Sequence, residues 1–84
     1  MTYGFTKHAF RILRKLPRDV SRRILEKLDW YVAQEDPLEF AETLSDYAIG
    51  AYRFRMGDYR VVFDIDDEGD ILILLVGHRR DIYR

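Results

Sequence analysis

The segment that most constrains the fold is Tyr52–Asp64, which reads YRFRMGDYRVVFD. Polar and apolar residues alternate on both sides of Gly57 and Asp58, as in two strands joined by a tight turn. If these two residues form the whole turn, Arg55 lies directly opposite Arg60. The alternation therefore predicts a β-hairpin with one apolar face, which joins the core, and an opposite face that carries arginines.

The arginine face has two interpretations. Arg53 shares it with Arg55 and Arg60, and like charges directly opposite each other in an antiparallel pair are destabilising, which suggests that an anion binds over them. Guanidinium groups match phosphate in a planar, bidentate way. In the alternative, the face is solvated and its arginines pair with Asp58, Asp64 or carboxylates on a neighbouring strand. The hairpin alone leaves both interpretations open.

Composition limits the classes of protein to consider. The chain has 84 residues, 48% of them hydrophobic and 35% charged, so we expect residues 1–84 to form one small folded domain. The absence of cysteine excludes disulfide scaffolds and a cysteine nucleophile. We expect no metal site, because the two histidines lie far apart and the acidic turn 66–70 lacks the length and pattern of an EF-hand loop. We expect no other cofactor. No apolar run approaches a membrane span, so we expect a cytoplasmic protein without a membrane partner.

The segments around the hairpin predict an α+β fold. An N-terminal helical hairpin should pack on one face of a small, mostly antiparallel sheet, in the order β-α-α-β-β-β. The expected elements before the hairpin are a strand at 3–5, a helix at 7–16 capped by Thr6, a helix at about 18–34 and a short turn at 38–44. Residues 71–76, ILILLV, are all apolar. We expect them to form an interior strand buried on both faces, with the first strand on its free edge.

The sequence after this strand, GHRRDIYR at 77–84, is rich in side chains that suit phosphate chemistry. Gly77 permits a bulge or bend that re-aims the following residues, and we expect them over the same face as the hairpin arginines. The resulting cluster contains Arg53, Arg55, Arg60, His78, Arg79, Arg80 and Tyr83. Arginines would stabilise a scissile phosphate, an imidazole would transfer a proton, and an aromatic ring would stack on a base. Taken singly, His78 could instead cap the strand end. Arg79 and Arg80 could pair with Asp81 or with the acidic turn 66–70.

Together, YRFRMGDYRVVFDID and VGHRRDIYR resemble the RelE toxins of the RelE/ParE superfamily, and the likeness covers essentially the whole chain. The resemblance implies a toxin of a type II toxin–antitoxin system that cleaves mRNA in the ribosomal A site and so inhibits translation. The cleavage would be metal-independent, with the 2′-hydroxyl attacking the adjacent phosphate. Matched by motif position, the catalytic residues would be Arg53, Arg55, Arg60, Arg79 and Tyr83.

Some members of this family have lysines where this chain has Arg53 and Arg55. Arginine stays protonated, so these two residues should act by charge and positioning. That leaves His78 or Tyr83 as the general base, and we expect Arg80 and Arg84 to bind RNA.

The resemblance also implies partners. A cognate RelB-like antitoxin would wrap the toxin and block its entry into the ribosome, and operator DNA would be contacted only through the antitoxin. Two alternatives stay open. One is a ParE-like inhibitor of DNA gyrase. The other is a catalytically weak homologue that still binds the antitoxin, which the net charge of −1 favours because RNA binders usually carry excess positive charge.

Overall fold

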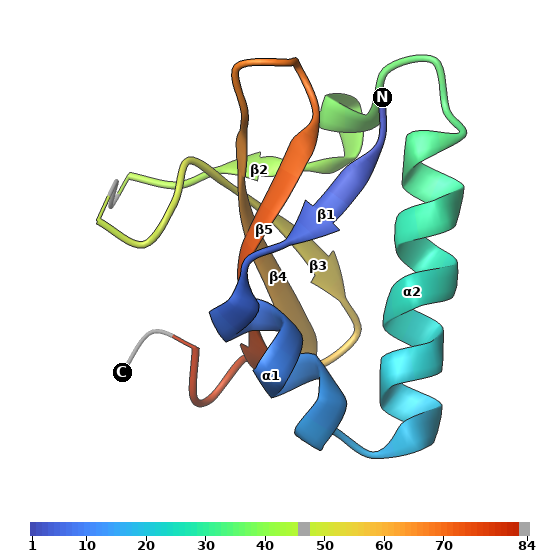
Figure 1. Ribbon diagram of the computed structural model, residues 1–84, viewed down its shortest axis with the longest axis vertical. Coiled ribbons are helices and arrows are strands. Elements are labelled where there is room, and N and C mark those ends of the chain that lie inside the picture. The colour runs from blue at the N-terminus through green and yellow to red at the C-terminus, as the bar shows by residue number, and fades with distance from the viewer. Residues whose placement is uncertain (46–47, 83–84) are drawn as a thin grey trace.

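The computed structural model describes residues 1–45 and 48–82. Five strands form one mixed sheet, and two α-helices cover one of its faces (Figure 1). The elements are β1 (Tyr3–Phe5), α1 (Lys7–Lys15), α2 (Arg18–Val32), the 3₁₀ helix η1 (Pro37–Phe40), β2 (Glu42–Thr43), β3 (Tyr52–Met56), β4 (Tyr59–Ile65) and β5 (Ile71–His78). The strand order is β1-β5-β4-β3-β2. Among the strands of the described residues, only the β1–β5 pair is parallel, so the predicted α+β fold is confirmed.

The hairpin of β3 and β4 has the register that the alternation predicts. Arg55 pairs with Arg60, and Met56 pairs with Tyr59 across the turn. The two residues between them form the whole connection, and Gly57 has a φ of 61°. Glycine at the first position of a two-residue turn suits a type II′ turn, whose twist matches that of the strands.

The core lies between this sheet and the two helices. Phe54 stacks on Tyr31 of α2 with ring centroids 4.1 Å apart, and on Phe63 of β4 at 4.5 Å. α1 supplies Ala9 and Leu13 to the same cluster. Both helices therefore cover the face predicted to be apolar, and the arginine face is left on the outer side.

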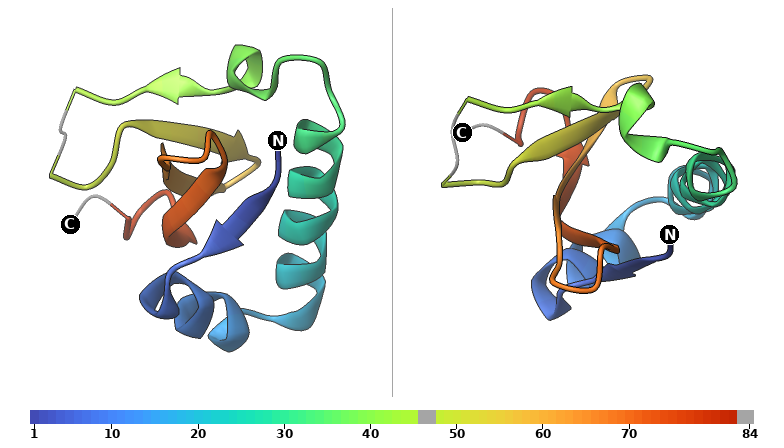
Figure 2. Two further views of the ribbon diagram at one scale, coloured as in Figure 1. Left: turned by 45° about the horizontal axis from the view of Figure 1, so that its top comes forward. Right: turned by 90° about the horizontal axis from the view of Figure 1, so that it is seen from above.

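Local signals place the helix ends. The Thr6 hydroxyl accepts a hydrogen bond from the Ala9 backbone N–H at 3.1 Å, as expected of an N-cap. Pro17 separates the helices, and Pro37 follows the end of α2, where the chain turns through η1 towards β2 at the sheet edge (Figure 2). β2 is a strand where the sequence predicted only a turn. Within the described ranges, no helix is long and apolar enough to cross a membrane.

The N-terminal strand is tied to α2 by one short hydrogen bond. The Tyr3 hydroxyl donates to the Asp29 carboxylate at 2.7 Å. Partial burial, together with this bond and the charge of Asp29, raises the pKa of Tyr3 to about 12.

β5 differs from its predicted environment. Ile71, Ile73 and Val76 are buried as expected, but the leucines at 72, 74 and 75 are only half-buried because no helix covers the outer face. The pairing with β4 also shifts: Phe63 pairs with Ile73, whereas Val62 pairs with Leu75. One extra residue on β5 is the mark of a β-bulge, so the irregularity lies at Leu74 and not at Gly77.

The outer face of the sheet is not polar throughout. Val62 points to that side and is completely buried. Gly50, with a φ of 148°, lies so close that a Cβ there would be 2.5 Å from Val62 Cγ1. The connection between β2 and β3 thus covers one part of the outer face, and the arginines occupy the part nearer the turn.

Candidate functional site

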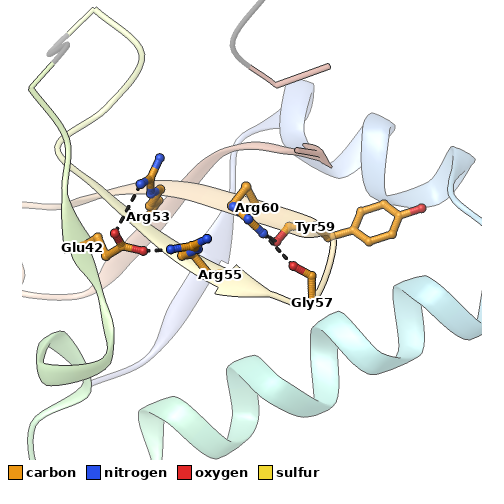
Figure 3. A network of polar contacts seen from close by, with 6 residues as sticks. All are labelled: Glu42, Arg53, Arg55, Gly57, Tyr59 and Arg60. Atoms are coloured by element: carbon orange, nitrogen blue, oxygen red, sulfur yellow. Dashed lines mark hydrogen bonds and ion pairs between the residues drawn. The ribbon is translucent and has the colours of Figure 1, made fainter. Parts of the chain in front are cut away.

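Two of the predicted site residues are joined by a carboxylate from the neighbouring strand. Arg53 pairs in register with Glu42 of β2, and its Nη2 lies 3.2 Å from Glu42 Oε2. Arg55 lies two residues farther along the same face, with its Nε 3.5 Å from Glu42 Oε1. Figure 3 shows the carboxylate between the two guanidinium groups. The two arginines therefore converge, as predicted, and a neighbouring strand supplies the counter-charge that the alternative interpretation named.

The charges explain the titration of Glu42. Its hydrogen bond with Arg53 is the largest cause that lowers the pKa of Glu42, and the positive charges of Arg53 and Arg55 add to it. Partial desolvation opposes this shift but does not outweigh it. Glu42 is consequently ionised at neutral pH, and its side chain is 43% exposed.

Arg60 is held differently from the other two. It is only 5% exposed, and its Nη1 donates to the backbone carbonyls of Gly57 at 2.8 Å and Tyr59 at 2.9 Å (Figure 3). In register it faces Gly77 of β5, which has no side chain to occupy the space. A buried guanidinium that binds the backbone of the turn fixes the shape of the turn. Arg60 is therefore a positioning residue in this structure.

The segment after β5 returns to the hairpin turn. The Arg79 backbone N–H donates to the Asp58 carbonyl at 2.7 Å. The Arg79 side chain also faces Asp58, with Nε 3.7 Å from Asp58 Oδ1. Arg79 is thus brought to the same end of the sheet as Arg55. Arg80 is exposed, and its backbone N–H donates to His78 Nδ1 at 3.1 Å.

His78 lies on the opposite face from the arginines, and the expectation that it joins them is wrong. It pairs in register with Tyr59, and their rings meet edge-on at 5.5 Å. Tyr59 points to the helix side, away from the arginines in Figure 3. The cause is the bulge at Leu74, because one extra residue moves every following side chain of the strand to the other face.

Two predicted residues, Tyr83 and Arg84, lie outside the described residues. In the ranges 1–45 and 48–82, no three histidine, aspartate or glutamate side chains are placed to hold a metal ion.

A groove adjoins this site on the helix side. Its volume is about 720 Å³, and it lies between α2 and the hairpin turn. Arg55 and Asp58 line it from the hairpin, while Lys27 and Trp30 line it from α2. The Lys27 ammonium lies 4.7 Å from the centre of the Trp30 ring, a cation–π distance. The turn residues thus border both the arginine face and a groove with aromatic and basic walls.

Sequence reasoning missed Glu42. A two-residue strand has no periodicity, so nothing marked residues 42 and 43 as part of the sheet. The one usable signal was indirect, since an arginine face of this kind needs a carboxylate or another anion nearby.

Known proteins share both this sequence and this fold. A family model described as "ParE toxin of type II toxin-antitoxin system, parDE" matches residues 3–83. A curated relative, Toxin RelG of Mycobacterium tuberculosis, is 38% identical over 84 residues, which is 99% of this chain and 95% of that protein.

Solved structures agree with the sequence match. The RelBE2 toxin–antitoxin complex of Mycobacterium tuberculosis contains a chain with a TM-score of 0.78 and 35% identity, covering 93% of this chain and 96% of that one. The intact RelBE toxin–antitoxin complex of E. coli gives a TM-score of 0.71 over 92% of this chain and 94% of that one. At 21% identity, the second likeness concerns the fold alone.

Proposed function

The chain belongs to the RelE/ParE family of toxins from type II toxin–antitoxin systems, and from this premise we propose that it is an endoribonuclease that cleaves mRNA in the ribosomal A site. The observation that carries this proposal is that Arg53 and Arg55 meet at one carboxylate, that of Glu42, while Arg79 contacts Asp58 of the adjoining hairpin turn. Arg55 and Arg79 leave 58% and 59% of their side chains exposed, so an RNA backbone has access to them.

In the proposed reaction the 2′-oxygen attacks the adjacent phosphorus and the P–O5′ bond breaks. The products are a 2′,3′-cyclic phosphate and a 5′-hydroxyl. Negative charge grows on the non-bridging oxygens in the transition state, and guanidinium groups that are already in position stabilise it. Arg53 and Arg55 would hold these oxygens, and Arg79 would approach from the turn. Because the arginines supply the positive charge, the proposed reaction needs no metal ion.

Two protons must move in this reaction, one from the 2′-hydroxyl and one to the 5′-oxygen. Arginine stays protonated and cannot take the first. Of the two candidates from the sequence, His78 lies on the opposite face of the sheet beside Tyr59, so we propose Tyr83 as the base. A Tyr83→Phe variant tests this assignment, since it removes the hydroxyl and should abolish cleavage if that hydroxyl takes the proton.

We also propose that the chain binds a RelB-like antitoxin. The support is that the RelBE2 chain of Mycobacterium tuberculosis, which is 35% identical to this chain, was determined in a toxin–antitoxin complex. In this proposal the antitoxin prevents ribosome entry, and it alone contacts operator DNA.

Primer extension on mRNA in a translating extract tests the proposed activity. We expect cuts at A-site codons that require ribosomes and are absent from naked mRNA. Arg55→Ala should reduce cleavage roughly 100-fold, as the loss of one charge-stabilising donor does. Arg22→Ala removes an equally charged, exposed residue on α2 and should cleave like the wild type. Translation that stops without cuts would contradict nuclease activity.

Gyrase inhibition is the second candidate, because the matched family model is named for a ParE toxin. A supercoiling assay with purified gyrase distinguishes the two. Loss of supercoiling at toxin concentrations that leave mRNA intact would replace the nuclease proposal.

A further inference from the structure

The carboxylate of Glu42 occupies the two guanidinium groups that the proposed function assigns to an RNA phosphate. Its two oxygens lie opposite different arginines, Oε2 at 3.2 Å from Arg53 Nη2 and Oε1 at 3.5 Å from Arg55 Nε. A phosphodiester also presents two non-bridging oxygens to such a pair. Glu42 and the phosphate therefore need the same donors, and one must leave before the other binds.

The ion pair is placed so that it can open. β2 is only two residues long and lies at the sheet edge, where little structure depends on the position of its side chain. Glu42 and Arg55 leave 43% and 58% of their side chains exposed, and exposed ion pairs of this kind are weak. Arg53 leaves only 26% of its side chain exposed, so the pair with Arg55 should open first. A phosphate of an RNA chain that is also held at other points can displace the carboxylate.

We propose that Glu42 is an intramolecular competitor for phosphate that sets the anion affinity of Arg53 and Arg55. The RNA target rests on the proposed function, whereas the competition requires only an anion. This competition should make the site selective for RNA over small phosphates. An isolated phosphate must displace Glu42 with two contacts alone, whereas RNA held at several points does so readily. Glu42 thus lowers the occupancy of the site by free nucleotides and inorganic phosphate.

The direct test follows the side chain of Arg55 by NMR while inorganic phosphate is added to the full chain. Arg55 Nε is itself an atom of the ion pair, so its N–H resonance reports occupancy of the site. Glu42→Gln keeps the shape of the side chain and removes its charge. We expect Glu42→Gln to bind phosphate about three- to tenfold more tightly than the wild type, the range that ion pairs at a protein surface allow.

Glu39→Gln is the matched control. Glu39 is exposed in η1, three residues from Glu42. Its replacement by glutamine changes the net charge by the same amount. Among the described residues it takes no part in the ion pairs of the arginine face. Glu39→Gln should bind phosphate as the wild type does. If both variants gain the same phosphate affinity, the gain reflects net charge and the competitor role of Glu42 is overturned. Unchanged or weaker phosphate binding in Glu42→Gln overturns it as well.

A second measurement uses a 2′-O-methyl RNA oligonucleotide, which cannot be cleaved, and reads binding by fluorescence anisotropy. Glu42→Gln should again bind about three- to tenfold more tightly. The gain should vanish when Arg53→Ala and Arg55→Ala are also present, because nothing is then left to compete for. A gain that survives in this triple variant contradicts the proposal.

These tests separate the inference from the function it builds on. If Glu42→Gln binds phosphate more tightly but the wild type makes no ribosome-dependent cuts, the competitor role of Glu42 stands and the nuclease proposal is overturned. If the wild type makes ribosome-dependent cuts but Glu42→Gln and Glu39→Gln bind phosphate equally, the nuclease proposal stands and the competitor role of Glu42 is overturned. Glu42→Gln that binds RNA no better than the wild type and no longer cleaves would make Glu42 a participant in the reaction, and would overturn its role as a competitor.

Discussion

On the helix-facing side of β3 and β4, Phe54 and Phe63 are completely buried and stacked, whereas on the outer side Arg55 leaves 58% of its side chain exposed beside Glu42. The inner face is held by close packing, which leaves one arrangement of each ring. Near the turn, the outer face is held by ion pairs and by two carbonyls that bind Arg60. Stability should therefore depend on the inner face, and anion chemistry on the outer one.

The comparison also applies within the outer face. Arg55 and Arg60 are direct partners across the hairpin, yet one is mostly exposed and the other is 5% exposed. A side chain that holds the turn and a side chain that is open to ligand thus lie next to each other. Four predictions test these differences, and they are arranged from the largest expected effect to the smallest.

Phe54→Ala should have the largest effect, because it removes a ring packed between Tyr31 and Phe63. We expect a loss of about 3–5 kcal/mol in the free energy of unfolding. Urea denaturation followed by circular dichroism measures it. Phe10→Ala is the control, since Phe10 is 48% exposed and its loss should be far smaller. Equal losses would show that the inner face is not the main source of stability.

Gly50→Ala should follow, at a cost of about 2–3 kcal/mol. The new Cβ would lie 2.5 Å from Val62 Cγ1, and the φ of 148° is strained for any other residue. Gly4→Ala provides the comparison in the same urea experiment, because no atom lies within 4 Å of a Cβ at that position. A neutral Gly50→Ala would mean that the segment over Val62 is free to move away.

Arg60→Ala should destabilise the protein by about 1–2 kcal/mol, because the carbonyls of Gly57 and Tyr59 lose a charged donor. Arg55→Ala should leave the free energy of unfolding within about 0.5 kcal/mol of the wild type. Both are measured by urea denaturation together with phosphate binding. If Arg55→Ala proves the more destabilising of the two, the division of roles between these arginines is wrong.

The pH dependence of Glu42 should be the smallest effect. Its pKa in the folded chain is below the ordinary value of 4.5, so the folded state binds fewer protons than the unfolded state. The stabilising contribution is therefore present above pH 4.5 and is lost as the pH falls from there through the lowered pKa. Urea midpoints measured from neutral to acid pH should fall less in Glu42→Gln than in Glu39→Gln. Parallel curves would contradict a shifted pKa at Glu42.

Much of the fold follows from local patterns in the sequence. Gly57 and Asp58 fixed the hairpin register, and alternation fixed which residues of β3 and β4 face the core. The same reasoning failed for His78, because ILILLV is apolar throughout and its pattern does not reveal which residue is the bulge. The position of Glu42 was equally hidden, since it depends on a long-range pairing with Arg53 rather than on any local preference.

The place of β5 in the sheet bears on how the protein is made. β5 lies between β1 and β4, so the first strand to be synthesised has no partner until residues 71–78 are available. Before then the helices have only part of the sheet to pack on, and contacts between distant segments form late. A nascent chain therefore cannot complete its sheet while these residues are still inside the ribosome. The packing of the helices on the whole sheet thus waits for the last strand to emerge.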